Sequence, residues 1–358
     1  MTLYANQSRP PNEVFFLGAG ASVSGGSPTF ANFRNKAKDV LSKMLENREL
    51  NSTKISLFQD VLTQWDKDFS DYNIEEYYSA IEMNEQLNRE DESTTEEIAK
   101  FIALTIQKSI DTPSTPSYEL LAAYAVTKAI ITTNWDILLE CSIRKSLGTN
   151  SFSYGNGIQP YGKITQPQSP GSTRYVIPIL KLHGSLNWGF CKKCGQIYCF
   201  GEKIYGQLLS NNGKKCEKHD HDVRLTPLIV PPTLSKLEGA EMRKEKSPYV
   251  PLRSIWSKAS EYLMVCEKVY FIGYSFPETD VQMKHFISNA LRKNENLKEV
   301  TIVSNPKYGK LRVDFEDRYS SILSKIKNNS KVIFNYDGFE IFCEEQLRKV
   351  KGRCEVVS

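Results

Sequence analysis

The chain has 358 residues, of which 40% are hydrophobic and 25% charged, and its formal net charge is +4. This composition is ordinary for a globular protein, and the length suffices for one large domain with a smaller one. No apolar run approaches the roughly 20 residues of a membrane-spanning helix, and the modest charge does not indicate direct nucleic-acid binding.

The eight cysteines indicate the compartment in which the protein folds. The N-terminal stretch has no apolar signal core, so secretion is not indicated. We therefore expect a cytoplasmic protein whose cysteines are metal ligands or free thiols, since disulfides are rare in a reducing compartment.

The first ordered feature is an apolar run, Val14-Phe15-Phe16-Leu17, that leads directly into Gly18-Ala19-Gly20-Ala21-Ser22. This order predicts a fully buried strand followed by a loop without bulky side chains, where the backbone can approach a ligand closely. A helix over residues 31–45 follows Pro28, and free N–H groups at a helix start would bind phosphate. The alternative is a plain strand–turn of an α/β protein, and the spacing differs from Gly-x-Gly-x-x-Gly.

Residues 56–109 are predicted to be helical with polar breaks, because apolar side chains recur at helical spacing. Aromatic residues such as Trp65, Tyr77 and Tyr78 are expected in a core or an interface. This block lies between the first strand and the next one, so it is an insertion beside the sheet.

Strands and helices alternate after this insertion. The expected strands are 129–132, 175–182, 228–230, 269–272, 300–303 and 332–335. The expected helices are 117–127, 137–145, 252–266, 282–291, 313–326 and a final one, and residues 151–172 are expected to form a mobile loop. Alternation predicts a mostly parallel sheet with right-handed crossovers and helices on both faces. Polar motifs follow five strands, so they can converge on one pocket at the carboxyl edge.

Two ligand pairs indicate a metal module. Cys191-Lys-Lys-Cys194 is followed after 21 residues by Cys216-Glu-Lys-His219, which fits a structural zinc ribbon. The alternative is two unrelated thiol pairs. His219 is the least certain ligand, because Cys199, Asp220 or His221 could replace it. We predict three units: a Rossmann-like domain of residues 1–50, 112–186 and 227–358, a helical insertion of 51–111, and a zinc-ribbon module of 187–226.

The motifs taken in order resemble the sirtuin (silent information regulator) family. They are Gly18-Ala19-Gly20-Ala21-Ser22, Thr132-Thr133-Asn134-Trp135-Asp136, Lys181-Leu182-His183-Gly184, the two ligand pairs, and Gly273-Tyr274-Ser275. The resemblance covers residue 14 to about 306, and it implies that NAD binds between a Rossmann-like domain and a smaller zinc and helical domain.

The resemblance also implies a role for each motif residue. Gly18, Ala19, Gly20 and Ser22 would cradle the NAD phosphates, while Gly273, Ser275 and Asn305 would line the adenosine end. Asn134 would hold the nicotinamide ribose or a water beside it, and Asp136 would lie near the carboxamide. His183 would be the general base on a ribose hydroxyl, which suits the pKa of histidine. Alone, His183 or Asn134 would more often be structural.

Several departures separate this chain from the family's deacylases. The loop reads Gly26-Ser27-Pro28-Thr29-Phe30, without the family's acid and adjacent arginine, for which Arg34 is a candidate substitute. Trp135 replaces a small aliphatic residue. The segment Pro227-Leu228-Ile229-Val230-Pro231-Pro232 stands where deacylases pair with their peptide, and its two final prolines remove backbone donors.

With these departures the chain resembles more closely the sirtuin-like proteins of bacterial antiviral defence. The motif Gly-Tyr-Ser-Phe-x-x-x-Asp, Gly273 to Asp280, and the Pro-Leu-Ile-Val-Pro-Pro segment are typical of that branch. That resemblance implies an NAD+ glycohydrolase that depletes NAD+, works as a homo-oligomer and awaits a separate activator, such as a DNA-translocase-like ATPase or a short Argonaute. The alternatives are an NAD-dependent protein deacylase or ADP-ribosyltransferase, and a non-catalytic nucleotide-binding or assembly module.

Overall fold

The structure is a computed structural model. It describes residues 12–47, 52–88, 93–124, 129–148, 151–155, 158–161, 176–201, 214–219, 223–230, 249–277, 280–304, 312–324, 326 and 330–355. No helix among these residues is both long and apolar enough to cross a lipid bilayer.

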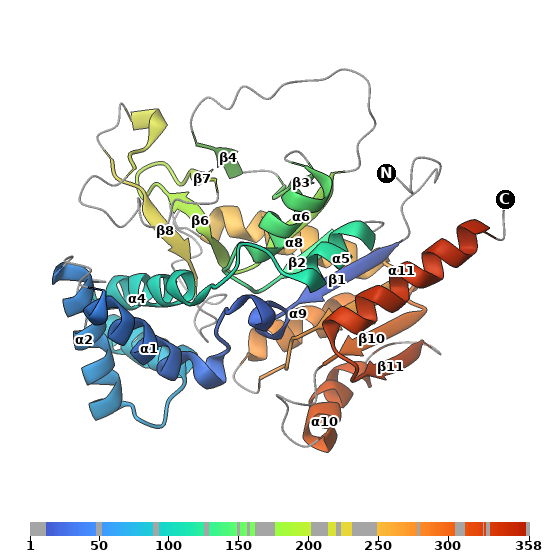
Figure 1. Ribbon diagram of the computed structural model, residues 1–358, viewed down its shortest axis with the longest axis horizontal. Helices are drawn as coiled ribbons and strands as arrows, with labels where there is room; N and C mark the ends of the chain where they lie inside the picture. The colour runs from blue at the N-terminus through green and yellow to red at the C-terminus, as the bar shows by residue number, and fades with distance from the viewer. Residues whose placement is uncertain are drawn as a thin grey trace.

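A seven-stranded, all-parallel sheet forms the centre of the large unit (Figure 1). Its order is β11 (Lys331–Asn335), β10 (Glu299–Val303), β9 (Lys268–Ile272), β1 (Glu13–Leu17), β2 (Ala129–Thr132), β5 (Ile177–Lys181) and β3 (Phe152–Ser153). Every residue of β1 is buried, as expected for a central parallel strand. The predicted Rossmann-like, mostly parallel sheet is confirmed.

Helices cover both faces of this sheet. Neighbouring residues of β9 show this, because Tyr270 pairs with Phe342 of one helix while Phe271 pairs with Tyr319 of another. Successive side chains of a strand point to opposite faces. One layer holds α5 (Pro116–Tyr124), α6 (Leu138–Leu147) and α11 (Phe339–Glu355), and the other holds α8 (Tyr249–Val265), α9 (Val281–Arg292) and α10 (Arg312–Leu323).

Two local expectations were wrong. The loop expected after Gly18 forms a 3-10 helix, Ala19–Gly25. The helix expected over residues 31–45 is confirmed as α1 (Phe33–Glu46), which follows a second short turn at Phe30–Asn32. The expected loop of 151–172 contains β3 and β4 (Ile158–Pro160), which pair with β5 and β7 (Ile197–Cys199). Strand pairing to neighbours distant in sequence organises these residues, and local composition cannot report it. Residues 162–172 lie outside the described residues.

The helical insertion forms its own apolar core. It consists of α2 (Ser52–Asp68), α3 (Ile74–Asn88) and α4 (Ser93–Ser109), and the buried face of α1 packs with it. Trp65 stacks on Tyr77 with ring centroids 5.2 Å apart, and both are buried, which confirms the core role of these aromatics. This core extends to Trp135, Leu186 and Ile229, so the insertion also contacts the loops at the sheet edge.

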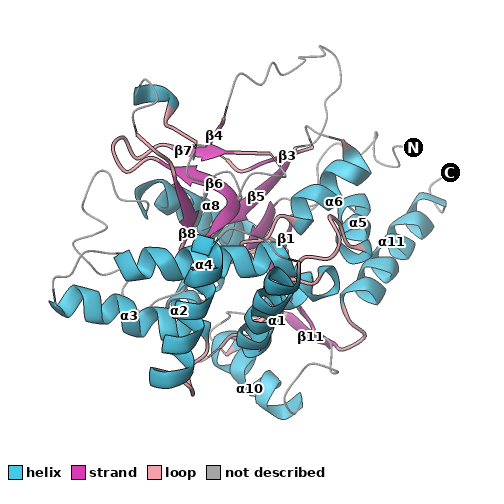
Figure 2. Cartoon of the chain, turned by 60° about the vertical axis from the view of Figure 1, so that its left-hand side comes forward, coloured by secondary structure: helices cyan, strands magenta, loops and turns pink. Residues whose placement is uncertain are grey.

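A second sheet of four strands carries the metal ligand pairs. Its order is β4, β7, β6 (Gly184–Phe190) and β8 (Thr226–Ile229), and Figure 2 shows it above the helices of the insertion. β6 begins immediately after the end of β5, separated only by Leu182 and His183. The small sheet therefore starts at the carboxyl edge of the large one. The predicted domain limits stay a prediction.

Alternating charges mark the amino end of the large sheet. The first residues of four adjacent strands are in register as Lys331, Glu299, Lys268 and Glu13. Together with α11 they line a cavity of about 360 Å³. Opposite charges on neighbouring strands favour this register over a shifted one.

Burial of Glu13 gives the sheet a pH-dependent stability. Burial raises the pKa of this carboxyl above its ordinary 4.5, although Tyr124 and Lys268 oppose the shift. A raised pKa in the folded state means that the free energy of unfolding falls as pH rises from 4.5 through the folded pKa. We predict that Glu13→Gln makes the free energy of unfolding less dependent on pH and is more stable than the wild type at pH 7. The glutamine can still accept a hydrogen bond from Tyr124. Denaturant unfolding between pH 4 and 8 checks it, with the exposed Glu46→Gln as control, and a wild-type pH profile in Glu13→Gln would contradict it.

Candidate active site and metal centre

The loops after β1 and β9 are in direct backbone contact at the carboxyl edge. Gly18 N–H donates to Ile272 O at 2.9 Å, Gly20 N–H donates to Gly273 O at 2.8 Å, and Gly273 N–H reaches Val303 O of β10. Gly273 has φ +64°, and a Cβ there would lie 2.2 Å from Ala21 N. These glycines therefore let two turns pack closely, a role separate from any ligand contact.

Asn134 is held by its amide nitrogen. Nδ2 donates to Gly18 O at 2.9 Å and to Ser22 Oγ at 3.0 Å, with Tyr118 Oη at 3.4 Å. Asn134 is 8% exposed. Its Oδ1 has no hydrogen-bond donor among the residues that the structure describes. The side chain is thus oriented with its acceptor oxygen left for a ligand or water.

Three hydrogen bonds, two between backbones and one from a side chain, link the segment of Asn134 to the turn of His183. Leu182 N–H donates to Thr132 O, Leu186 N–H donates to Trp135 O, and Trp135 Nε1 donates to His183 O, each at 2.9 Å. The next residue, Gly184, has φ +82° and its missing side chain would meet Leu228 O at 2.2 Å. His183 therefore occupies a tight turn whose backbone is fixed.

His183 itself is 4% exposed, with its ring centroid 6.1 Å from that of Trp256 in α8. Trp256 Nε1 donates to the carbonyl of Leu182. Two indoles, those of Trp256 and Trp135, thus hold consecutive carbonyls around this histidine.

Asp136 is engaged within the protein. Its Oδ1 accepts from Leu138 N–H at the start of α6, and its Oδ2 accepts from Ser27 Oγ at 3.2 Å. Burial raises the pKa of Asp136, and the nearby Lys181 ammonium opposes the rise. These contacts make Asp136 a residue that organises the loop.

The remaining predicted ligand residues occupy different environments. Gly20 and Ser275 are exposed, Ala19 is partly exposed and Gly18 is buried. Ser22 is fully buried, and its Oγ lies 2.8 Å from Tyr118 Oη. Asn305 lies outside the described residues. Arg34 does not reach this site, because its guanidinium donates to the carbonyls of Phe69, Ser70 and Tyr72 and lies 4.5 Å from the Trp65 ring centroid.

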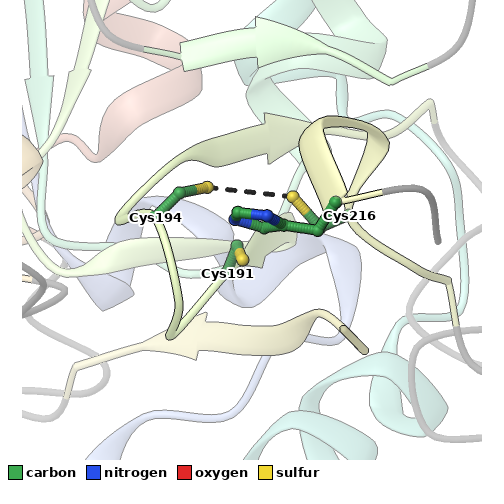
Figure 3. A group of neighbouring side chains, drawn as sticks. Cys191, Cys194 and Cys216 are labelled. Atoms are coloured by element: carbon green, nitrogen blue, oxygen red, sulfur yellow. Dashed lines mark hydrogen bonds between the residues drawn. The ribbon is translucent and has the colours of Figure 1, made fainter. Parts of the chain in front are cut away.

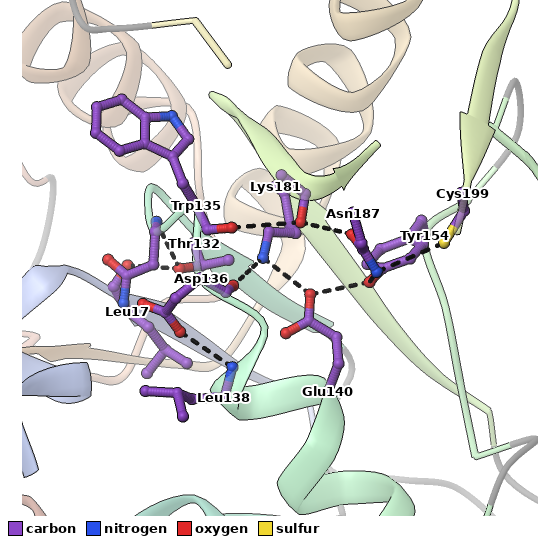
Figure 4. Close-up of polar contacts among 12 residues, drawn as sticks. Leu17, Thr132, Trp135, Asp136, Leu138, Glu140, Tyr154, Lys181, Asn187 and Cys199 are labelled. Atoms are coloured by element: carbon purple, nitrogen blue, oxygen red, sulfur yellow. Dashed lines mark hydrogen bonds and ion pairs between the residues drawn. The ribbon is translucent and has the colours of Figure 1, made fainter. Parts of the chain in front are cut away.

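A buried polar network joins the two sheets beneath this edge (Figure 4). Lys181 Nζ contacts Glu140 Oε1 at 2.9 Å, with both side chains at most 2% exposed, and also donates to Asp136 O. Tyr154 Oη donates to Glu140 at 3.0 Å and accepts from Asn187 Nδ2 at 3.2 Å. Sequence reasoning missed this network and Tyr118. A lysine ending an apolar strand was the one available signal, since buried lysines are rare unless paired.

Four predicted ligands come together in the small sheet. Ligand atoms of Cys191, Cys194, Cys216 and His219 lie within 4.8 Å of one another, and Figure 3 shows the three thiols converging. The cysteines are not in disulfides, and Cys194 Sγ lies 3.8 Å from Cys216 Sγ. A tetrahedral zinc with Zn–S bonds of about 2.3 Å sets sulfurs about 3.8 Å apart.

The histidine supports this fit. His219 Nε2 is buried and has no hydrogen-bond partner in the structure, as expected of a nitrogen reserved for a metal. Cys199, a possible substitute, instead contacts Asn187 Nδ2 at 3.7 Å. Asp220 and His221 lie outside the described residues. The donor set fits a closed, structural zinc site.

Comparisons with known proteins give structural similarity only. No family model matches the chain, and no curated protein matches it. A crystal structure of a Sir2 homologue in complex with NAD is 15% identical, with 95% of this chain and 90% of that chain covered and a TM-score of 0.49. A Sir2 homologue variant with ADP-ribose is 14% identical, with 96% and 93% covered and a TM-score of 0.48. A structure solved for sirtuin substrate affinity is 16% identical, with 98% and 99% covered and a TM-score of 0.41. With TM-scores below 0.5, the assignment of function depends on the site itself.

The contact between the two glycine loops can be tested by adding one methyl group. We predict that Gly273→Ala destabilises the fold by about 2 kcal/mol or more, because its Cβ meets backbone atoms that cannot move away. Gly201→Ala is the matched control, since a Cβ there meets nothing within 4 Å. Equal unfolding free energies for the two variants would refute the close contact.

The metal site can be tested with a neighbouring cysteine as control. We predict that Cys191→Ser loses zinc and unfolds at a lower temperature, because one of four ligands is removed. Cys199→Ser should keep stoichiometric zinc, since its sulfur is not one of the four. Metal analysis and thermal unfolding check both, and zinc retained by Cys191→Ser would contradict the assigned ligand set.

Proposed function

We propose that this protein is an NAD+ glycohydrolase, which cleaves NAD+ to nicotinamide and ADP-ribose. The observation that carries the proposal is the orientation of Asn134. Its amide nitrogen is occupied by Gly18 O and Ser22 Oγ, which leaves Oδ1 as an acceptor at the carboxyl edge of the sheet. Ligands of open α/β sheets bind at this edge.

The two glycine turns support a dinucleotide at the same place. Gly20 and Ser275 are exposed on adjacent loops, so the backbone at these two positions is open to a phosphate. We infer that the phosphates of NAD+ lie along residues 18–22 and the adenosine end along residues 273–275. Asn305, which is outside the described residues, remains a proposed contact of the adenosine end.

The proposed chemistry needs an acceptor oxygen and a base. Breaking the bond between nicotinamide and the ribose C1′ builds positive charge on the sugar, and neutral nicotinamide leaves with the bonding electrons. Water then adds to C1′ and gives up a proton. Asn134 Oδ1 would accept a hydrogen bond from this water or a ribose hydroxyl, and the imidazole of His183 would take the proton. Asp136 would act near the carboxamide by fixing the loop.

Water is proposed as the acceptor because the edge of the small sheet disfavours a peptide strand. β8 is the edge strand, Pro227 within it lacks an N–H, and α4 packs beside it (Figure 2). Adding a peptide strand requires a free row of backbone donors and acceptors. Pro231 and Pro232 lie outside the described residues. This arrangement favours hydrolysis over protein deacylation or ADP-ribosylation.

The biological setting follows from the motif resemblance. We propose an antiphage-defence effector of the cytoplasm that depletes NAD+ as a homo-oligomer. A separate protein, such as a DNA-translocase-like ATPase or a short Argonaute, would release its activity. Structural zinc would stabilise the small sheet without taking part in the reaction.

The proposal predicts loss of NAD+ cleavage in two variants. Asn134→Ala and His183→Ala should each lower the rate of nicotinamide release by about 100-fold or more, because an oriented acceptor or a general base is removed. Chromatography of nicotinamide and ADP-ribose measures the rate. The matched control is His285→Ala, which removes an exposed histidine of α9 and should retain wild-type activity.

Other outcomes separate the alternatives. Turnover that requires an acetylated peptide would indicate a deacylase, and ADP-ribose attached to protein would indicate a transferase. Binding of NAD+ without turnover, with and without candidate activators, would indicate a nucleotide-binding module. Full activity of both Asn134→Ala and His183→Ala would refute the assigned site.

A further inference from the structure

Lys181 is a buried charge at the end of an otherwise apolar strand. It is the last residue of β5, two residues before His183, and its side chain is 1% exposed. A buried ammonium is costly even when paired, and an apolar side chain of similar length would often pack equally well. The ammonium group carries three donors, so it can contact groups of several segments at once.

That contact crosses between the two proposed catalytic segments. Lys181 Nζ donates to the backbone carbonyl of Asp136, two residues after Asn134, and to Glu140 Oε1 in α6. One ammonium group thus ties the strand leading to His183 to the loop carrying Asn134. Glu140, in the first turn of α6, binds the same ammonium group and so connects this helix to the two segments (Figure 4).

The other end of the network returns to the turn of His183. Tyr154 Oη donates to Glu140, Asn187 Nδ2 donates to Tyr154 Oη, and Ser185 Oγ donates to Asn187 Oδ1 at 2.8 Å. Lys181 and Ser185 lie two residues before and two residues after His183. The network therefore brackets this histidine on both sides, and it begins and ends in groups buried from solvent.

We infer that Lys181 is a positioning residue of the site, which acts with Glu140 to hold the Asn134 loop and the His183 turn in one arrangement. The kinetic part of this inference rests on the proposed function. Lys181 touches no reacting atom. Its contribution is to reduce the freedom of two segments that must act on the same ribose.

The test removes both charges together. Replacing one partner alone would strand the other as an unpaired buried charge, whereas Lys181→Met/Glu140→Gln replaces the pair by neutral side chains of similar length. The control is Asn294→Ala, a buried residue whose amide holds the carbonyls of Leu263 and Cys266 at the end of α8. It loses buried hydrogen bonds without touching either segment.

For NAD+ cleavage we expect kcat of the double variant to fall about tenfold or more while KM changes less than about threefold. We also expect amide hydrogen exchange to accelerate at Leu182 and Leu186, whose N–H groups link the two segments. Asn294→Ala should change neither the kcat nor the exchange at these amides. Wild-type kcat or unchanged exchange in the double variant would overturn the inference.

The inference can still be tested if the double variant does not fold or if the wild type does not cleave NAD+. If the double variant does not fold, Ser185→Ala replaces it, since it opens the network on the other side of His183; a lower kcat at constant KM supports the inference and a wild-type kcat overturns it. If the wild type does not cleave NAD+ under any condition, the proposed function fails, and hydrogen exchange alone then decides the positioning role.

Discussion

The site depends on the position of β1 between β2 and β9. Because strands flank it on both sides, the chain leaving its carboxyl end is hydrogen-bonded from two directions. Gly18 N–H binds Ile272 O of β9, while Gly18 O accepts from Asn134, which follows β2. The neighbouring Leu17 O accepts from the backbone N–H of Thr133. Three loops are therefore fixed by one peptide segment, and a glycine is needed because Tyr274 atoms occupy the space of a side chain.

Many polar side chains are buried at this edge, and nearly all of their polar atoms have hydrogen-bond partners. The network through Lys181, Glu140, Tyr154 and Asn187 links the end of the large sheet to the small one. Glu140 Oε2 is an exception, since it is buried without a partner. Such networks stabilise less than an apolar core of equal volume, but they specify one arrangement. The proposed function requires such a fixed arrangement, because it needs the amide of Asn134 and the imidazole of His183 to be oriented toward the same ligand.

The sequence predicts the large sheet well because each central strand is a short apolar run bounded by glycine or polar residues. β1 and β9, for example, are completely or almost completely buried, so their pattern reports their environment directly. The two metal-ligand pairs could be predicted equally well, because the spacing of two ligands within one turn is visible in the local sequence. The predicted fourth ligand, His219, is the one whose nitrogen joins the three thiols.

Other features could not be read from local sequence. Tyr118 approaches Asn134 from α5, and Lys181 meets Glu140 from 41 positions away, so only the tertiary fold brings them together. Arg34 illustrates the reverse error. It was the candidate substitute for the arginine of the family's loop, yet its guanidinium donates to backbone carbonyls of the helical insertion. Sequence shows which groups are available and not which partners use them.

Trp135 shows how the helical insertion is connected to this edge. Its indole belongs to the apolar core formed by α1 to α4, while its N–H holds the carbonyl of His183 and its backbone separates Asn134 from Asp136. Packed side chains move together, because interiors are too dense to absorb a displacement locally. A rearrangement of the helices that displaced Trp135 would therefore shift both proposed catalytic segments at once. The insertion is thus part of the support of the site, because Trp135 joins its core to the turn of His183.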